Sequence, residues 1–422
     1  MRYLNTLTKV ILFTYILISV SNVGAVTLRD QFKRIHDRIA AVHPDETILL
    51  AMETACTTAD SSVNFSDSAT WSTACYDAAA NVAVEHPGFY NVTLKNMVAP
   101  WTNEAQTVFE PLNDYTATVI GMVRDNADFR DILSANILYT IGDPASPPFG
   151  LPEYSKTNNN HYANAESQGV DLKANLQATT QSNIDTLAIP PSAAAGVMTT
   201  RAAAKAFYVD GTNRAMFRFT ILNHFCNDLE ILKDVTLSSD RIRQDVSRSP
   251  GGDSRIYLNN CIGCHTGMDA LAGAFAYYQY QYDPATDPQA QNGQLVYSEV
   301  IGAGHKYLIN ADNFKWGYAT TDNSWINYWR KGPNSTLGWD SGLPGSGTGA
   351  ASLGAELAAT DVFASCQAKK VFQTVCLRPP VDQNDRNQIS AMASTFKTGG
   401  YNLKQSFVEA AGYCLLPPPP PL

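Results

Sequence analysis

Residues 261–265 read Cys-Ile-Gly-Cys-His, a C-x-x-C-H sequence that occurs once in this chain of 422 residues. Two thiols at this spacing can each add across one vinyl group of a haem, which leaves two thioether bonds to the polypeptide. The histidine that directly follows the second thiol is then placed to ligate the iron. The sequence therefore predicts one covalently bound haem c, attached through Cys261 and Cys264 and ligated by His265.

Two other interpretations of the motif stay open. A thioredoxin-like redox pair shares the C-x-x-C spacing, but it belongs to a βαβ setting and carries no directly following histidine. Here the motif follows a turn-forming stretch, Ser-Pro-Gly-Gly-Asp at 249–253. A zinc site would need a second ligand pair, and the chain contains no second C-x-x-C. We favour haem over both.

The N-terminus is typical of an exported protein. Arg2 and Lys9 form a short basic region, residues 10–20 are almost wholly apolar, and Val23-Gly24-Ala25 places small residues before a cleavage site. An uncleaved membrane anchor is the alternative, but the apolar run is shorter than the roughly 20 residues that span a bilayer. We predict a signal peptide over 1–25, a mature chain without a transmembrane anchor, and a periplasmic or cell-surface location.

Six cysteines remain outside the motif. In an oxidising compartment an even number indicates disulfides, and six cysteines allow about 15 pairings. We predict a Cys56–Cys75 pair because these residues lie at the facing ends of two expected helices; buried free thiols are the alternative. The six residues are Cys56, Cys75, Cys226, Cys366, Cys376 and Cys414.

The net charge limits the choice of partner. Cleavage after Ala25 removes two of the 30 basic residues and leaves 28 against 39 acidic ones, a net charge of −11. A nucleic-acid partner is therefore not expected, because phosphate binding depends on a basic surface. An acidic surface can steer a basic redox partner protein instead.

The hydrophobic pattern predicts a mainly α fold in two units. Residues 26–145 are expected to form a helical N-terminal unit, and residues 199–416 a cytochrome-c-like helical haem unit with long loops. A segment rich in Pro, Asn, Ser and Ala over 146–198 connects them, and a Pro-rich tail occupies 417–422. Helices are expected over 28–42, 47–56 with Asp45 as the cap, 69–84, 108–122, 129–138, 199–232, 353–376, 384–396 and 403–414, and loops over 284–350.

The residues that follow the motif carry a family resemblance. They read Thr-Gly-Met-Asp-Ala-Leu-Ala-Gly-Ala-Phe over 266–275, and they resemble exported cytochrome-c-like proteins of the planctomycete type. In that group the haem motif is followed by an apolar residue and then Asp-Pro-Leu-Gly. Met268, Asp269 and Leu271 match, whereas alanines stand where Pro and Gly are expected.

The resemblance covers roughly residues 195–415. Upstream of the motif it includes the Arg-containing apolar segment at 214–222, and downstream it includes the Gly-Gly-Tyr-Asn-Leu turn that ends at Leu403. It implies an exported haem protein of mostly helical fold and assigns no reaction.

The sixth iron ligand must come from another segment. Met268 lies three residues after His265 in the same expected helix, so it faces the same side and cannot reach the opposite axial position. His305 is the preferred candidate because the glycines before it permit a close backbone approach. Met392 ranks second, and His224 is a third candidate.

Aromatic and basic side chains surround the motif in the sequence. We interpret the tyrosine run after it as packing beside the haem. One or two arginines before it are expected to pair with the haem propionates, with a solvated basic face as the alternative. These residues are Tyr277, Tyr278, Tyr280, Tyr282, Arg241, Arg243, Arg248 and Arg255.

Three function classes are consistent with this sequence. The first is a one-electron carrier with a six-coordinate haem. The second is a haem enzyme of the peroxidase or oxygenase type with an open distal site, in which His305 or Asp312 would act as the acid–base group. The third is a haem-bearing structural or binding protein, which would account for the long N-terminal half.

Overall fold

Helices dominate the computed structural model, as the sequence predicts, and its three two-stranded sheets are small. The structure describes residues 26–184, 189–209, 211–243, 254–299 and 318–415. The predicted signal peptide and the predicted Pro-rich tail lie outside these ranges.

The α-helices are distributed along the described chain except the stretch between α14 and α15. They are α2 Leu28–Ala40, α3 Glu46–Ala59, α4 Thr73–Ala83, α5 Lys95–Val98, α6 Asp114–Arg124, α7 Asn160–Ser167, α8 Leu172–Asn175, α9 Gln181–Ile184, α10 Arg201–Phe207, α11 Arg214–Phe225, α12 Leu229–Leu232, α13 Ser254–Ile256, α14 Ile262–Ala272, α15 Gly349–Ala358, α16 Asp361–Cys376, α17 Gln383–Thr398 and α18 Leu403–Leu415.

The other elements are short. Two π-helical segments are η2 Phe89–Leu94 and η8 Tyr257–Cys261, and the 3-10 turns include η4 Phe129–Leu133 and η11 Tyr328–Arg330. The antiparallel strand pairs are β1 Leu138–Ile141 with β2 Leu176–Thr179, β3 Tyr278–Gln281 with β4 Gln294–Tyr297, and β5 Ser324–Ile326 with β6 Ser346–Thr348.

Local capping explains where several helices begin. The Asp45 side chain accepts a hydrogen bond from the Ile48 backbone N–H at 2.9 Å, which confirms Asp45 as the cap of α3. The helix expected over 108–122 starts only at Asp114, because the Asn113 side chain caps it through the Thr116 N–H. The helix expected over 353–376 is two helices, since Thr360 caps α16.

One expected helix is wrong in its second half. The chain forms the 3-10 turn η4 over Phe129–Leu133, and Leu138 begins strand β1. That strand pairs with β2, which lies in the segment expected to be a connection. The segment 146–198 also carries α7, α8 and α9, so it contributes short elements of its own to the fold.

The main hydrophobic core runs through both expected units, and a small second cluster of Ile242 and Tyr257 lies beside Cys261. One cluster of buried side chains extends from Leu28 in α2 to Leu415 in α18. Helix α18 packs against α4 and α2, so the C-terminal helices cover the N-terminal hairpin. The described helices of the N-terminal unit are therefore not packed apart from the rest of the chain.

A buried carboxylate joins the N-terminal part of the chain to α10. Asp114, at the first turn of α6, is 2% exposed and accepts hydrogen bonds from the backbone N–H groups of Arg201 and Ala202, at 2.6 and 3.0 Å. These are the first residues of α10, where a helix has N–H groups without internal partners. Asp114 thereby fixes α10, which leads into α11 and, further along the chain, the C-x-x-C-H motif.

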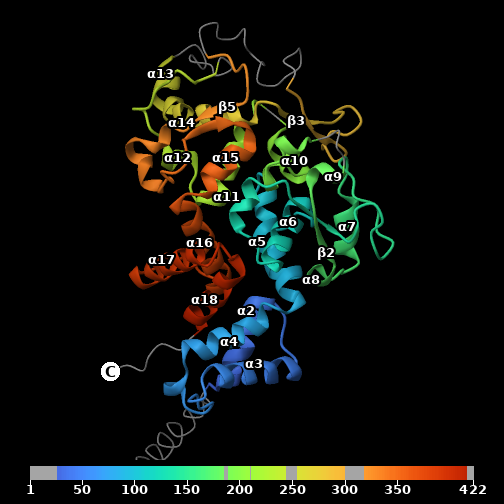
Figure 1. The fold of residues 1–422 in the computed structure, drawn as a ribbon, viewed down its shortest axis with the longest axis vertical. Coiled ribbons are helices and arrows are strands. Elements are labelled where there is room, and N and C mark those ends of the chain that lie inside the picture. Colours follow the sequence, from blue (N-terminus) through green and yellow to red (C-terminus); the bar gives the residue numbers. More distant parts are fainter. Residues whose placement is uncertain (1–25, 185–188, 210, 244–253, 300–317, 416–422) are drawn as a thin grey trace, which may run out of the picture.

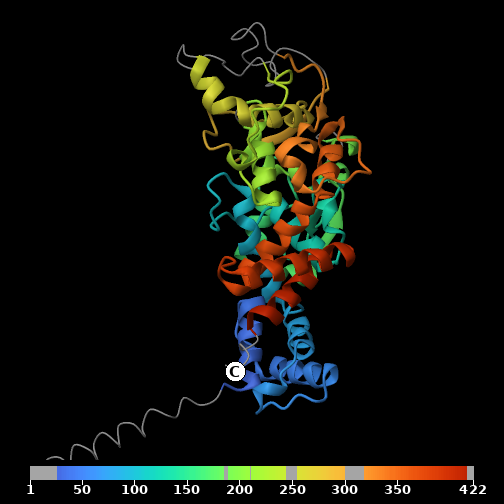
Figure 2. The ribbon, with the colours of Figure 1, turned by 90° about the vertical axis from the view of Figure 1, so that its left-hand side faces the viewer.

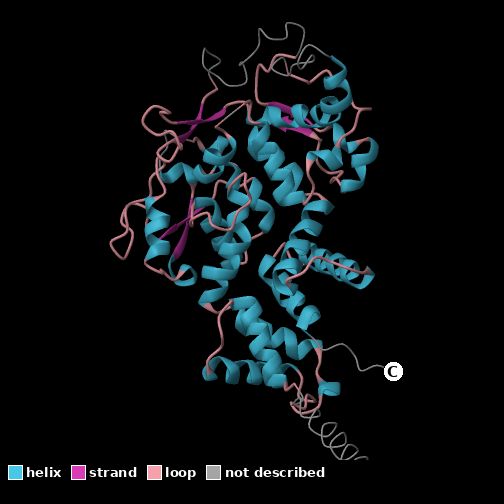
Figure 3. Cartoon of the chain, turned by 180° about the vertical axis from the view of Figure 1, so that it is seen from behind, coloured by secondary structure: helices cyan, strands magenta, loops and turns pink. Residues whose placement is uncertain are grey.

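The elements are arranged along one long axis. Figures 1 and 2 show the hairpin of α2, α3 and α4 at one end and α13 and α14 at the other. The view from behind in Figure 3 shows the strands as small pieces at the edges of a helical body. No helix among the described residues has the length and apolar character needed to cross a membrane.

Candidate functional site

The C-x-x-C-H motif lies on one helical run at the end of the molecule (Figure 1). Cys261 closes the π-helical turn η8, and Cys264 and His265 follow in the first turn of α14. Residues three and four positions apart lie on one side of a helix, so the two thiols and the imidazole face the same direction. π-helical turns are frequent at functional sites.

The structure divides the eight cysteines, all of which it describes, into two groups. The predicted Cys56–Cys75 disulfide is confirmed, with the Cα atoms 4.1 Å apart. Two further disulfides, Cys226–Cys366 and Cys376–Cys414, use the remaining four cysteines outside the motif. The alternative of buried free thiols is therefore wrong for all six. Cys261 and Cys264 stay unpaired and half-buried.

The electrostatics of Cys264 do not favour a thiol redox pair. Burial raises the pKa of the Cys264 thiol, and the charge of Glu230 acts in the same direction. Reactive cysteines of disulfide oxidoreductases have lowered pKa values instead, because the thiolate is the nucleophile. The Cys264 Sγ atom lies 3.6 Å from the Leu229 carbonyl oxygen, a neutral partner that gives a thiolate no stabilisation.

The motif residues do not form a metal-binding cluster of their own among the described residues. Among the described His, Cys, Asp and Glu residues, no group of three or more is arranged to hold a metal ion. Cys261, Cys264 and His265 are included in that set.

His265 is oriented by a carboxylate one helical turn away. Its Nδ1 atom lies 3.1 Å from Oδ1 of Asp269, in the i, i+4 relation along α14. An ionised carboxylate only accepts hydrogen bonds, so Nδ1 carries the proton and donates it. In the neutral imidazole, the second ring nitrogen, Nε2, then carries the lone pair with which a histidine ligates a metal.

Asp269 is itself held by several donors. The guanidinium of Arg214 donates two hydrogen bonds to it, Nε to Oδ1 at 2.6 Å and Nη2 to Oδ2 at 2.8 Å. The Arg243 backbone N–H donates a further one to Oδ2 at 3.2 Å. Burial alone would raise the pKa of Asp269, but the charge and hydrogen bonds of Arg214 outweigh it and hold that pKa well below its usual range.

Sequence reasoning identified Asp269 only as a match to a family pattern. The signal that could have found its role is the four-residue spacing between His265 and Asp269, since such pairs are neighbours on a helix. Arg214 precedes Asp269 by 55 residues and comes from α11, so no local pattern links them.

Close packing fixes α14 in place. A side-chain carbon added at Gly267 would lie 2.0 Å from Nε1 of Trp329, so only glycine lets the indole lie against this helix. Trp329 is 1% exposed and comes from η11. On another side, the Asp234 backbone N–H donates to the Gly263 carbonyl oxygen at 2.9 Å.

Exposed apolar side chains surround the motif. Ile231 on α12, Val235 in the following loop, Ile256 on α13 and Leu258 in η8 are all exposed. Helix α12 contacts α14, and Val235 borders Gly263 within the motif. These exposed apolar side chains suit a porphyrin, which needs apolar walls next to its thioether attachment points.

The candidate sixth ligands are not brought together with His265 among the described residues. His305 and Asp312 lie outside those residues. Met268 is buried in the core on the motif helix itself, as its sequence position requires. Met392 is fully buried in α17, which packs against α16 and α18 and lies far from α14 along the axis in Figure 1.

His224 is engaged elsewhere. Its Nε2 atom lies 3.1 Å from the Tyr115 hydroxyl oxygen, and its Nδ1 atom lies 3.4 Å from Nε2 of Gln367. Burial, reinforced by the charge of Lys370, lowers the pKa of His224 to about 3, so the ring is neutral. It acts as a core histidine with partners at both nitrogens.

The tyrosine run belongs to the β3–β4 hairpin and its approach. The ring of Tyr278 stacks on Tyr208 of α10, with centroids 5.6 Å apart. The Tyr280 hydroxyl donates to the Ala290 carbonyl oxygen at 2.9 Å and accepts from Arg201. Both side chains pack within the described protein, while Tyr277 and Tyr282 are only half-buried.

The arginines before the motif differ in burial and in their partners. Arg243 is 2% exposed and its Nη1 donates to the Thr212 carbonyl oxygen at 3.0 Å. Arg241 lies over the ring of Tyr318 and donates to its hydroxyl at 2.7 Å. Arg255 is exposed on α13, and Arg248 lies outside the described residues. A continuous basic face is therefore absent from the described part of this segment.

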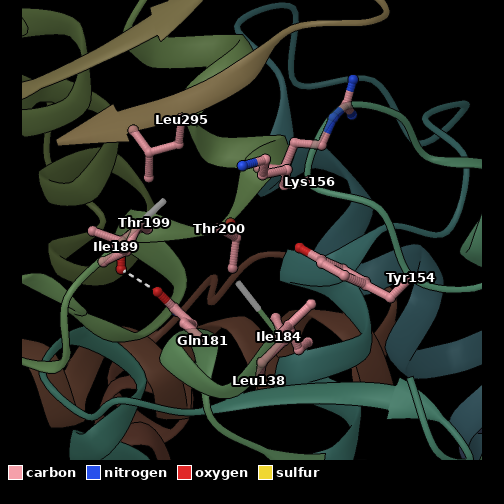
Figure 4. Close-up of a pocket in the computed structure, with 10 residues that line it drawn as sticks. Leu138, Tyr154, Lys156, Gln181, Ile184, Ile189, Thr199, Thr200 and Leu295 are labelled. Atoms are coloured by element: carbon pink, nitrogen blue, oxygen red, sulfur yellow. Dashed lines mark hydrogen bonds between the residues drawn. The ribbon is translucent and has the colours of Figure 1, made fainter. Parts of the chain in front are cut away.

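A pocket away from the motif is too small for an organic substrate. Figure 4 shows it between β1, α9 and the start of α10, with Gln181 and Thr199 joined by a hydrogen bond of 2.8 Å. Its volume is about 40 Å³. That volume holds no more than a few water molecules.

No family model, curated protein or solved structure matches this chain. The resemblance to planctomycete-type cytochrome-c-like proteins therefore stays a prediction.

Proposed function

We propose that this chain is an exported monohaem c-type cytochrome-like protein that transfers single electrons in the periplasm or at the cell surface. Cys261 and Cys264 would hold the haem through thioethers, and Nε2 of His265 would be the proximal ligand. The haem would supply the one-electron chemistry, and the protein would supply its attachment, orientation and electrostatic surroundings.

The partition of the cysteines carries this proposal. Six cysteines form three disulfides, and the two left over are those of the C-x-x-C-H motif. They lie beside a histidine whose other ring nitrogen already has a carboxylate partner. Metal-ligating histidines characteristically have such a partner. Three disulfides also fit an oxidising compartment.

Intact mass of the mature protein tests the proposal directly. After export in a host that attaches c-type haem, we expect the polypeptide starting at Val26, with three disulfides, plus the mass of one haem. The haem should resist extraction with acidified organic solvent, because thioethers do not dissociate. Haem that is fully extracted, or zinc in its place, would contradict the proposal.

The same carboxylate–histidine pair gives reason to keep a haem enzyme as a second candidate. A carboxylate raises the basicity of the histidine, and a more basic ligand stabilises oxidised iron, as oxidative chemistry at haem requires. The two candidates differ at the sixth position, which is filled in a carrier and open in an enzyme.

Carbon monoxide binding separates the two candidates. With His305 as the proposed sixth ligand, the reduced wild-type protein is expected to resist carbon monoxide, and its ferric haem to be low-spin. His305→Ala should open the site, giving high-spin ferric haem and rapid carbon monoxide binding; Met392→Ala serves as the control. Rapid, complete binding by the wild type would favour the enzyme. Resistance unchanged by His305→Ala would instead remove His305 as the ligand.

A further inference from the structure

Asp269 and the groups that donate to it form a charged array on the Nδ1 side of His265. The Asp269 carboxylate is fully buried. It accepts one hydrogen bond from His265, two from Arg214 and one from the Arg243 backbone. A group that accepts from four N–H donors acts as a carboxylate, since a protonated acid would present a donor of its own.

Arg214 is fixed as firmly as the carboxylate it binds. It is the first residue of α11, and its Nη1 atom donates to the Thr212 hydroxyl at 2.7 Å. The Thr212 carbonyl accepts from the Arg243 guanidinium, so one residue connects the two arginines. A planar guanidinium with two parallel hydrogen bonds holds a carboxylate in a single orientation.

The array has a direct electrostatic consequence for an iron bound to His265. An anion hydrogen-bonded to the ligand's second nitrogen makes the ligand a stronger electron donor, which favours the more positive ferric ion over the ferrous ion. The positive charge of Arg214, which pairs with Asp269, partly cancels this stabilisation of the ferric ion. The Asp269 side chain is fully buried and that of Arg214 is 19% exposed, so solvent screens this pair less than it screens an ion pair on the surface.

We propose that Asp269 and Arg214 are positioning residues that set the reduction potential of the haem in opposite senses: Asp269 lowers it by binding the Nδ1 proton of His265, and Arg214 raises it by neutralising Asp269. The inference rests on the proposed function, because it requires a haem on His265.

Redox titration of the haem-loaded protein tests the direction in which each residue shifts the reduction potential. Asp269→Asn keeps the shape of the side chain but removes its charge, and we expect the ferrous-to-ferric ratio at a fixed poise to rise about tenfold or more. For a one-electron couple that is a shift of about 59 mV. Arg214→Met should lower the ratio. If the two residues had only a structural role, their variants would not shift the reduction potential in opposite directions.

Two conservative variants guard against loss of folding. Arg214→Met leaves a buried carboxylate without its cation, which is destabilising. Arg214→Lys keeps the charge and should remain within about threefold of the wild-type ratio, since the charge rather than the fork sets the potential. Asp269→Glu restores the anion and should recover most of the shift seen with Asp269→Asn.

The chain offers a matched control on α17. The Asp385 side chain is buried like that of Asp269 and pairs with both terminal guanidinium nitrogens of Arg378, which is 41% exposed, but it lies in a different part of the fold. Asp385→Asn should leave the potential unchanged while removing the ion pair of a buried carboxylate. An equal shift in this variant would show a general effect of stability.

The outcomes separate this inference from the function on which it rests. Absence of covalent haem from the wild type would overturn the proposed function. Haem with an unchanged potential in Asp269→Asn, or shifts of the same sign in the Asp269 and Arg214 variants, would overturn only the inference. Failure of every folded Asp269 variant to acquire haem would overturn it as well, because Asp269 would then serve attachment.

Discussion

A variant with both Cys261 and Cys264 replaced by alanine is expected to mature without any covalently bound haem. The two thiols are the only cysteines of the chain left outside disulfides, so no other sulfur is available for a thioether. His265 alone would hold the group by a coordinate bond, which acid breaks. Intact mass should show the bare polypeptide, and acidified organic solvent should extract whatever haem is present.

The matched control removes the same number of sulfur atoms elsewhere. Cys376 and Cys414 join the ends of α16 and α18, and replacing both with alanine should leave the full haem mass in place. A single Cys264→Ala variant should keep one thioether and resist extraction. Covalent haem in the Cys261→Ala, Cys264→Ala double variant would contradict the assignment of these residues.

The sequence predicted those helices whose signals are local. Asp45 caps α3 as expected, and the apolar spacing over 28–42 gives α2 within two residues of its predicted end. The errors have non-local causes. The strand at Leu138 exists because β2, about 40 residues later, pairs with it, and hydrophobic spacing alone does not distinguish such a short run from a helix.

In the candidate site, too, the features with local sequence signals could be predicted and those that depend on distant residues could not. The motif itself and the Cys56–Cys75 pair could be predicted, because each depends on residues close together in the sequence. The partner of Asp269 could not, since Arg214 arrives from another helix. The Cys226–Cys366 pair was equally inaccessible, because its members are 140 residues apart and spacing does not rank such pairings.

Removal of the Cys226–Cys366 disulfide is expected to lower the free energy of unfolding by about 4 to 5 kcal/mol, because the bond closes a loop of more than a hundred residues. The sequence separation is 140 residues, and the loop contains the C-x-x-C-H motif. Cys226 caps the C-terminal end of α11, whose first residue is Arg214. The disulfide and the Arg214–Asp269 pair therefore hold the two ends of one helix. Urea unfolding of the Cys226→Ala, Cys366→Ala variant measures the loss.

Comparison with the Cys56–Cys75 disulfide separates loop closure from packing. Its sequence separation is only 19 residues, for which the chain-entropy relation gives about 3 kcal/mol. Cys56 and Cys75 are both fully buried, whereas Cys226 is partly exposed, so alanine substitution costs at least as much packing at the short-loop pair. A larger loss for Cys226–Cys366, by about 1 to 2 kcal/mol, must then come from the longer loop. Equal losses, or a greater loss for Cys56–Cys75, would show that local packing rather than loop closure sets the stability these bonds provide.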